Sequence, residues 1–549
     1  MRIPPFFIFC FFFVLNSCTS DSEETQLDTT PPEMQISFLG ISDSTSDEII
    51  AIGRSITIDI EASDEGGLQK VVASIDGAKV AEDTEAPYQL FINLSSFSSK
   101  SDAFKSEYKL KIEAVDIAGN VKSIEKTIIV RKELVKLNIP PTYYLSEWDR
   151  HFVFASDMEG NLLDIVRVFP NTQEITLYVN PEIPLDFDYM LTMGMYQSTQ
   201  GFSGSNLVTV ANLNGFVEIN LKPTVQIFHM DGINVPAIGF DSQDVFNSTG
   251  GGRLGGGFLS QDNETFSIYR NKDISSGIRP NQLYIDLYNV SLNTYSYTVL
   301  DWEINDITEI NRAMFVQDGI ENLLLTSDYL DDNDAHKSLS MIGFLDEEAF
   351  QNNIWSVYGT PLNRINNEYS YIYNSSFYKH IYSLTLDNYN VLAHGRPDNH
   401  YARLDWNIEY TYQDNEIGIT TSPGNHTVGN ILLTDNTNGG YDVNGKRVNY
   451  YWELIFDSQK QTSIKLPQIP EELQIWEFYP FYEQNSLDFN QVKISRYDGI
   501  LNYEDFLNKI IKEDESRFLN SSRIESIYKS ISGNYNSYLE SATLPLTRD

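Results

Sequence analysis

Cysteine is almost absent from this chain of 549 residues, which contains only Cys10 and Cys18. Basic residues are scarce as well, since 38 Lys and Arg face 77 Asp and Glu and leave a formal net charge of −39 at pH 7. Such a charge repels nucleic acid phosphates and anionic lipid headgroups, so we expect no nucleic acid partner. Most of the acidic side chains are expected on the solvated surface, where they favour solubility and attract divalent cations or cationic partners.

Familiar catalytic motifs are also missing. The sequence contains neither H-E-x-x-H nor G-x-S-x-G, the patterns that place a zinc-binding histidine pair on a helix or a nucleophilic serine on a sharp turn. Residues 440–447, GYDVNGKR, approach the phosphate-binding loop but carry Arg447 where a Ser or Thr should hold the metal. Because β-rich segments flank Asn444-Gly445, they predict a hairpin turn and no nucleotide site.

Only one strongly apolar run is present, Phe6–Leu15 behind Arg2. It is too short for a bilayer, which needs about 20 residues, but it matches the core of a signal peptide. The following Leu15-Asn16-Ser17-Cys18 resembles the lipobox of bacterial lipoproteins, which implies a signal peptide over 1–17 and a lipid on Cys18. Cleavage removes Cys10, so no disulfide can form within the mature chain. The alternative is a signal peptide cleaved nearby that leaves Cys18 free.

An acidic segment, Thr19–Glu24, follows Cys18. It resembles the short tract that routes Bacteroidota-type surface lipoproteins to the exterior of the outer membrane. The resemblance implies a protein that is anchored in the outer membrane by its lipid and faces outward. An ordinary flexible tether over 18–30 would have the same composition, and both interpretations stay open.

Alternation of apolar and polar residues after the tether predicts short β-strands, as in SITIDIEAS and YKLKIEAVD. Asp76-Gly77 predicts a tight hairpin, because glycine adopts the positive φ that such turns require. About seven strands of this kind predict a β-sandwich over 31–132. The segments DTTPPEMQI, EAPYQLF and EAVDIAGN resemble the bacterial Ig-like (cadherin-like) modules of surface proteins, which implies a spacer or adhesion unit.

Asp64, Glu65 and Asp116 lie at predicted strand ends of this module. The resemblance to cadherin-like modules implies that clustered oxygens there could bind Ca²⁺. Alternatively, Asp64 and Asp116 only accept hydrogen bonds from backbone amides and shape turns. Asp64 and Asp116 are therefore candidate metal ligands.

Strand patterns continue along the rest of the chain, so we predict an all-β protein in which a large β-rich region follows the Ig-like sandwich. Residues 148–221 are similar to transthyretin-like modules, which implies a small β-sandwich over 145–225, and Asn214-Gly215 predicts a hairpin within it. Residues 226–549 predict a head of sandwich or jelly-roll type, because no repeat of 20 to 50 residues supports a propeller. Apolar residues at helical spacing predict two short helices, over 502–512 and 521–532.

Two features of the head suggest ligand binding. The glycine-rich segment NSTGGGRLGGGF, 247–258, could bring Arg253 to an acidic sugar or a peptide carboxylate. Flat tryptophan rings can stack on sugar faces. The candidates are Trp302, Trp406 and Trp452, with Trp355 beside them. A mobile loop and packing in the core are the respective alternatives.

The segment HGRPDNH offers His394, Asp398 and His400 as two imidazoles and one carboxylate for a metal. A polar hairpin loop is the alternative. The acidic segment SDYLDDNDAH, 327–336, lacks the glycine and the glutamate of an EF-hand and predicts a solvated loop.

Together these patterns favour a surface lipoprotein with a noncatalytic binding or adhesion role toward glycan or another cell-surface polymer. One alternative is a surface-anchored hydrolase of polysaccharide or peptide, with His394, Asp398 and His400 as its candidate residues. Another alternative is a structural subunit of an outer-membrane complex.

Overall fold

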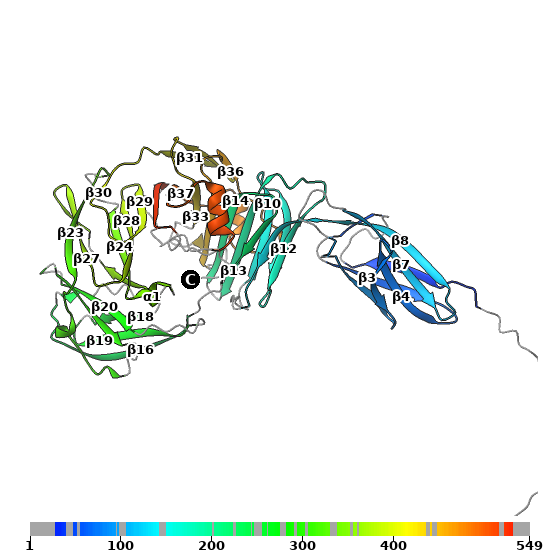
Figure 1. Ribbon diagram of the computed structural model, residues 1–549, viewed down its shortest axis with the longest axis horizontal. Coiled ribbons are helices and arrows are strands. Elements are labelled where there is room, and N and C mark those ends of the chain that lie inside the picture. Colours follow the sequence, from blue (N-terminus) through cyan, green and yellow to red (C-terminus); the bar gives the residue numbers. More distant parts are fainter. Residues whose placement is uncertain are drawn as a thin grey trace, which may run out of the picture. The chain divides into compact units, whose positions relative to one another are not determined.

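The computed structural model describes most of the chain between residues 28 and 530 (Figure 1). The described ranges are 28–39, 48–51, 55–94, 96–97, 106–141, 150–199, 202–222, 227–242, 244–245, 255–260, 262–274, 282–289, 292, 294–301, 306–329, 337–351, 355–359, 362–434, 440–441, 447–514 and 521–530. Cys18, the predicted signal peptide and the acidic tract lie outside these ranges. Within them, no helix has both the length and the apolar character needed to cross a membrane.

The chain folds into two compact units. Unit 1 comprises Met1–Ser98 and Phe104–Arg131, and unit 2 comprises Lys132–Asp549 together with Ser99–Ala103. Strands dominate both units, so the predicted all-β class is confirmed.

Unit 1 contains two β-sheets (Figure 1). The first has the order β1 (Glu33–Phe38), β3 (Ser55–Ser63), β6 (Tyr88–Asn93). The second has the order β2 (Glu48–Ala51), β8 (Val121–Val130), β7 (Glu107–Asp116), β4 (Leu68–Ile75), β5 (Ala78–Asp83).

Alternating side chains of both sheets fill the core of unit 1, including the fully buried Ile58 and Ile112. The predicted hairpin is present, because β4 and β5 pair across Asp76 and Gly77 at φ values of 48° and 82°.

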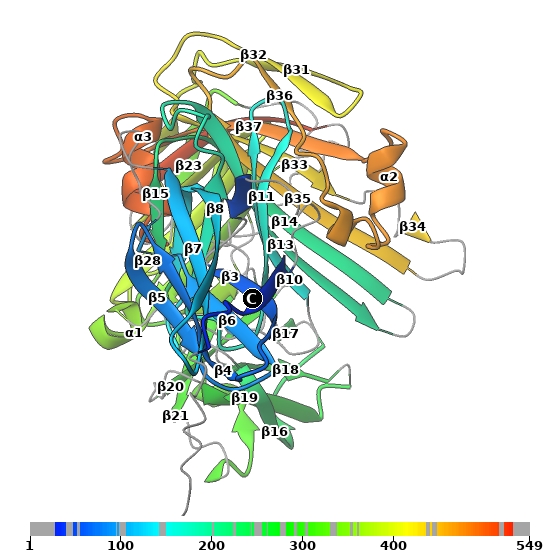
Figure 2. The same ribbon diagram turned by 90° about the vertical axis from the view of Figure 1, so that its right-hand side faces the viewer.

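A 13-stranded sheet forms the frame of unit 2. Figure 2 shows β13, β14, β35 and β33 following one another across it. Its order is β11 (Leu162–Val168), β10 (Arg150–Asp157), β13 (Asp188–Thr199), β14 (Phe202–Asn214), β35 (Arg447–Asp457), β33 (Val428–Thr434), β37 (Phe489–Tyr497), β38 (Arg523–Ser530), β29 (Tyr389–His394), β28 (Lys379–Leu386), β24 (Lys337–Phe344), β25 (Ser356–Gly359), with β34 (Gly440–Tyr441) beside β35.

Smaller sheets complete unit 2. They are β12 (Glu174–Val179), β9 (Lys132–Asn138), β15 (Val217–Asn220); β18 (Gly255–Leu259), β19 (Thr265–Ile274), β16 (Ile227–Ile238), β22 (Ile310–Asn311); β17 (Asp244–Val245), β20 (Gln282–Asn289), β21 (Thr294–Asp301); β26 (Asn363–Ile365), β27 (Glu368–Asn374), β23 (Ile320–Ser327), β30 (His400–Tyr401); and β31 (Ile408–Gln413), β32 (Glu416–Thr421), β36 (Ser463–Lys465). Both faces of the large sheet are covered, because alternate residues of β10 join two different apolar clusters.

The predicted boundary at 225/226 does not separate two compact units. Strand β14 pairs in parallel with β35, far along the chain, so one sheet crosses the boundary. The predicted hairpin at Asn214-Gly215 is also wrong. The chain turns there, with Gly215 at φ 67°, but β14 and β15 belong to different sheets, and β15 pairs with β9.

Short helices are few in the described ranges: α1 (Glu347–Gln351), α2 (Tyr479–Glu483), α3 (Tyr503–Phe506), the π-helical turn η5 (Leu507–Ile511), and the 3₁₀ turns η3 (Arg312–Met314) and η4 (Glu471–Leu473). The predicted helix over 502–512 corresponds to α3 and η5. The predicted helix over 521–532 is wrong, because Arg523–Ser530 forms strand β38 between β37 and β29. Its apolar residues face cores on both sides of the sheet, which removes the alternation typical of a half-exposed strand.

Candidate functional site

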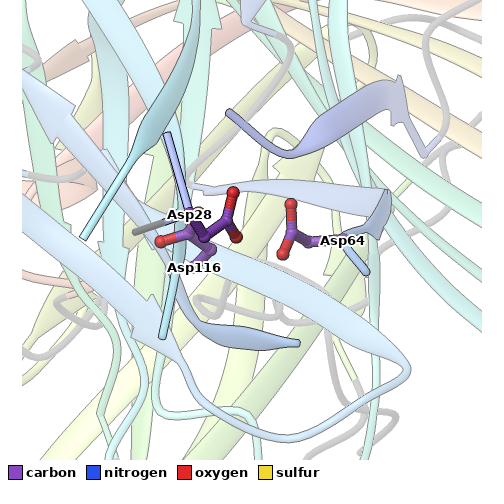
Figure 3. A group of neighbouring side chains, drawn as sticks. All are labelled: Asp28, Asp64 and Asp116. Atoms are coloured by element: carbon purple, nitrogen blue, oxygen red, sulfur yellow. The ribbon is translucent and has the colours of Figure 1, made fainter. Parts of the chain in front are cut away.

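Three aspartates converge at one end of unit 1 (Figure 3). Asp28 precedes β1, Asp64 follows β3 and Asp116 ends β7. One carboxylate oxygen of each lies within 4.8 Å of those of the other two. The sheet register explains the approach, because Asp116 pairs with Leu68 and therefore lies beside the turn that follows Asp64.

Asn120 orders this cluster. Its side-chain amide donates hydrogen bonds to the carbonyl oxygen of Asp28 (3.0 Å) and to Asp116 Oδ2 (2.8 Å), and its backbone N–H donates to Asp116 Oδ1 (2.7 Å). Burial alone would raise the pKa of the Asp116 carboxyl, but the hydrogen bonds from Asn120 and the neighbouring amides outweigh it and lower that pKa. The fully buried Asp116 is therefore a carboxylate at neutral pH.

Both sequence interpretations of Asp64 find support in the geometry. Its Oδ1 accepts a hydrogen bond from the Gly66 N–H (2.7 Å), as the turn interpretation predicts. A Cβ atom at Gly66 would lie 3.0 Å from Asp28 Oδ2 and 3.2 Å from Asp64 Oδ1, so glycine allows the two carboxylates to approach.

Carboxylate oxygens are the ligands that Ca²⁺ prefers, and three of them from separate elements suit such an ion. No other described group of three His, Cys, Asp or Glu ligand atoms lies as close together. Glu65, which the sequence placed beside the candidate ligands, is not part of the group. Asp28 is part of the group, although the sequence predicted it to lie in the tether. No sequence pattern indicates that the entry segment folds back onto the end of β7.

The predicted metal site in unit 2 is wrong. His394, Asp398 and His400 do not meet, because the chain turns after β29 and Asp398 forms an ion pair with Arg523 (2.6 Å). His400 lies in β30, which pairs with β23, and its Nδ1 is 2.9 Å from Thr326 Oγ1.

His400 also lies close to an acid, with 3.6 Å between its Nε2 and Asp328 Oδ1. The order hydroxyl, imidazole, carboxylate is that of a hydrolytic triad. However, the hydroxyl of Thr326 donates to the carbonyl of Asn399 (3.2 Å), and about half of each of the His400 and Asp328 side chains is exposed. A hydroxyl whose proton is held by a carbonyl is not activated by the imidazole, so this arrangement does not support nucleophilic catalysis.

The tryptophans proposed to stack on sugars lie in the core. Trp406 is 7% exposed and Trp452 is 1% exposed, and the indole N–H of Trp452 donates to Thr209 Oγ1 (2.9 Å). The stacking hypothesis is therefore wrong for both rings, because their faces are covered by other core residues. Arg253 and Trp302 lie outside the described part of the chain.

A polar pocket of about 660 Å³ lies in unit 2 beside β28, β29, β37 and β38. It contains two of the predicted metal ligands, His394 and Asp398, and Asp398 is paired there with Arg523. Its charged lining consists of Arg396, Arg496, Arg523, Asp398, Asp498 and Glu525.

Glu525 is the buried charged residue of the pocket lining, which is called the pocket floor below together with the two arginines that it contacts. Register places Arg496 opposite Glu525, and Arg523 lies two residues earlier on the same face of β38. Glu525 accepts hydrogen bonds from Arg496 Nη2, from Arg523 Nη2 (3.1 Å) and from the hydroxyl of Tyr389 (2.8 Å). The carboxylate thus holds two guanidinium groups in fixed positions.

Aromatic rings lie close to both arginines of this floor. The guanidinium of Arg523 lies 5.9 Å from the ring centroid of Tyr401, and that of Arg496 lies 5.8 Å from the Trp406 ring. The hydroxyl of Tyr401 accepts from the backbone N–H of Asp398 (2.8 Å) and donates to Tyr382 (3.0 Å). The cation–π contacts therefore help to orient the two guanidinium groups, and the hydrogen bond to Tyr401 holds the Asp398 backbone.

Both central groups stay charged over the ordinary pH range. Burial raises the pKa of Glu525, but the Arg496 hydrogen bond and the Arg523 charge outweigh it and lower that pKa. Burial lowers the pKa of Arg523, but Asp398 and Glu525 outweigh it and raise that pKa. Neither group is suited to proton transfer near neutral pH, whereas both are suited to binding a polar ligand.

Sequence reasoning missed Arg496, Arg523 and Glu525. Arg523 and Glu525 fall in the segment assigned to a helix, where residues two apart point in different directions. On a strand the same spacing places both on one face.

A family model described as a bacterial Ig domain matches residues 39–105. The Ig-like module predicted in unit 1 is thus confirmed. Among curated proteins, none matches the chain in sequence.

Three solved structures show weak likeness. The fibronectin(III)-like modules of Clostridium thermocellum CbhA are 20% identical over 18% of this chain and 98% of theirs, with a TM-score of 0.14. A 1.5-MDa bacterial ice-binding adhesin is 11% identical over 68% of this chain and 99% of its own, with a TM-score of 0.15. SGBP-B of the Bacteroides ovatus mixed-linkage glucan utilization locus was solved in complex with a mixed-linkage heptasaccharide. It is 11% identical over 63% of this chain and 100% of its own, with a TM-score of 0.15. These TM-scores are too low to carry an inference to this chain.

Proposed function

We propose that this protein is a noncatalytic binding protein of the cell surface that holds a glycan or another hydroxyl-rich polymer in the pocket of unit 2. The arrangement of Arg496, Glu525 and Arg523 carries this proposal. Sugar hydroxyls both donate and accept hydrogen bonds, and fixed charged groups bind them with little loss of side-chain freedom. Unit 1, with its Ig-like module, serves as the spacer between the anchor and the binding unit.

Binding is favoured over hydrolysis by the state of the pocket's charged groups. Glu525 is shared by two arginines and has a lowered pKa, whereas a general acid needs a raised one. Asp398 is paired with Arg523. These two carboxylates are therefore not suited to the role of general acid that the hydrolase alternative requires.

The location belongs to the same proposal. The lipobox at Leu15–Cys18 supports a lipid on Cys18, and the acidic tract after it supports display outside the outer membrane. Replacing Cys18 with Ala should move the protein from the membrane fraction to the soluble fraction. Protease added to intact cells should degrade the wild-type protein, and full resistance would contradict external display.

Affinity electrophoresis of the full chain in gels that contain different polysaccharides tests the binding role. We expect retardation by at least one polysaccharide without release of reducing ends. Arg496→Gln should weaken the retardation, and Arg167→Gln should not, because Arg167 is an exposed residue of β11 outside the pocket. Thermal unfolding of both variants verifies their folding. Turnover of a retained polysaccharide would overturn the noncatalytic role.

A further inference from the structure

The charge of the pocket differs from that of the chain. Acidic residues outnumber basic ones about two to one in the sequence, with 77 against 38. The pocket lining nevertheless contains as many arginines as carboxylates, three of each. Arginine forms bidentate hydrogen bonds with carboxylate groups, so this local enrichment indicates a ligand that carries negative charge.

The two carboxylates that pair with Arg523 differ in their surroundings. The Glu525 side chain is 9% exposed and is shared with Arg496 and Tyr389, so it is a fixed part of the floor. The Asp398 side chain is 49% exposed and its carboxylate contacts Arg523 Nη1 at 2.6 Å from the solvent side. Exposed ion pairs contribute little to stability, so this pair can open readily.

The backbone at Asp398 would stay in place if its side chain moved. Its N–H donates to the hydroxyl of Tyr401 (2.8 Å), which belongs to the core. Only rotation of the short side chain is needed to release Arg523. A preformed pocket of this kind needs little rearrangement to accept a ligand.

Arg396 provides a second cation at the same opening. It is exposed, lies two residues before Asp398 and lines the same pocket. Among the described residues, the structure gives Arg396 no carboxylate partner. Arg396 and Arg523 both belong to the lining, so a ligand carboxylate that replaces Asp398 at Arg523 has a second arginine in the same pocket.

Resting on the proposed function, we infer that the pocket binds an acidic polysaccharide through a uronate carboxylate, and that Asp398 holds the place of this carboxylate in the free protein. Arg523 and Arg396 bind the carboxylate, and the neighbouring Asn425 is available to sugar hydroxyls. Asn425 and Ser522 contribute an amide and a hydroxyl to the lining, and such groups form hydrogen bonds with sugar hydroxyls.

Calorimetric titration of the full chain with short oligogalacturonate, and with a cello-oligosaccharide of the same length, tests this inference. Short oligosaccharides limit the repulsion between a polyanion and the charge of −39. We expect the acidic ligand to bind at least about tenfold more tightly than the neutral one, as loss of one charge-assisted contact would predict.

Two variants test whether Asp398 and Arg396 act on the ligand carboxylate as inferred, and a third serves as the control. Asp398→Asn should strengthen oligogalacturonate binding by about threefold to tenfold, because the competing charge is removed while the shape is kept. Arg396→Gln should weaken it about tenfold. Arg167→Gln, which removes an exposed arginine elsewhere, should leave it unchanged. Circular dichroism verifies the fold of each variant.

The outcomes separate the inference from the proposed function. Equal or tighter binding of the neutral ligand overturns the acidic specificity and leaves the glycan role standing. Tight acidic binding with no effect of Asp398→Asn overturns the exchange of carboxylates. Failure to bind any polysaccharide overturns the proposed function itself. A short peptide with a free C-terminus is titrated in the same way, and tighter binding of this peptide than of oligogalacturonate overturns both.

Discussion

Two histidines of unit 2 are buried without charge. His151 is 1% exposed and His380 is 4% exposed, and burial lowers the pKa of each from 6.5 to about 4. The ring of His151 has no hydrogen-bond partner, whereas His380 Nε2 lies 2.8 Å from the carbonyl of Asn374. In the unfolded chain both imidazoles take up a proton near pH 6.5, whereas in the folded protein they do so only near pH 4. Acid therefore favours the unfolded state.

We predict that stability is full above pH 6.5 and falls as the pH decreases toward 4. For each histidine, the lowered pKa reduces the free energy of unfolding by at most about 3 kcal/mol between pH 6.5 and pH 4. The His151→Phe variant should stay folded, because the His151 ring makes no hydrogen bond that the phenyl ring would lack. It should lose less stability than the wild type as the pH falls. Denaturant unfolding at pH 7 and pH 5 measures the difference. An identical loss in wild type and variant would show that His151 is not the cause.

Glu525 provides a second prediction at this scale. Glu525→Gln removes the negative charge between Arg496 and Arg523 and should destabilise the protein by about 3 kcal/mol, because a partly buried positive charge is left uncompensated. Glu409→Gln is the matched control. It breaks an exposed pair with Lys529 and should have no measurable effect. Equal denaturation midpoints for the two variants would contradict the central role of Glu525.

At the scale of the element, glycine allows strands to pass beneath aromatic rings. Gly429 of β33 pairs with Phe456 of β35, and a Cβ at Gly429 would lie 2.1 Å from the Phe456 ring. We predict that Gly429→Ala costs about 1–3 kcal/mol through overpacking. Gly194→Ala should cost less, because its new methyl would lie 3.3 Å from the Trp476 ring. Urea unfolding of both variants tests the order, and the reverse order would contradict it.

Strand β38 shows why some elements were not predicted. Ile524 and Ile527 are three residues apart, which is typical of one helix face, and this spacing suggested a helix. In the structure Ile524 joins one apolar cluster and Ile527 the other. A strand buried on both faces has no alternation, so periodicity cannot distinguish it from a short helix. The half-exposed strands of unit 1, such as β3, alternate clearly and were predicted.

Residues of the candidate sites were predictable only where they belong to a recognisable local pattern. Asp64 and Asp116 were predicted because both lie at the ends of recognisable strands. Asp28 joins its site through the hydrogen bond from Asn120, and Arg496 joins its site through the pairing of β37 with β38. Local sequence holds no information about such contacts between distant segments. His394 and Asp398 were predicted to hold a metal together with His400, but Asp398 pairs with Arg523, which comes from a strand far along the chain.

At the scale of the whole molecule, long-range pairing unites unit 2. The parallel pair of β14 and β35 joins residues 202–210 to residues 447–455. A sandwich predicted from 145–225 alone could not include this partner. The composition and strand patterns were sufficient for the all-β class, whereas the order of strands in the sheet depends on contacts that no local pattern encodes.

The two units have separate cores, which allows a cation at the aspartate cluster to be tested in the full chain. A ligand that binds only the folded state raises the stability of the unit that holds it. We predict that millimolar Ca²⁺ raises the melting temperature of unit 1 by several degrees and leaves unit 2 unchanged in scanning calorimetry. Asp116→Asn should abolish the shift, because the buried carboxylate is a required ligand, whereas Glu65→Gln should preserve it, since Glu65 is outside the cluster. Sodium chloride at equal ionic strength controls for screening. The same shift with sodium, or with Asp116→Asn, would mean that the three carboxylates serve only to shape the turns around them.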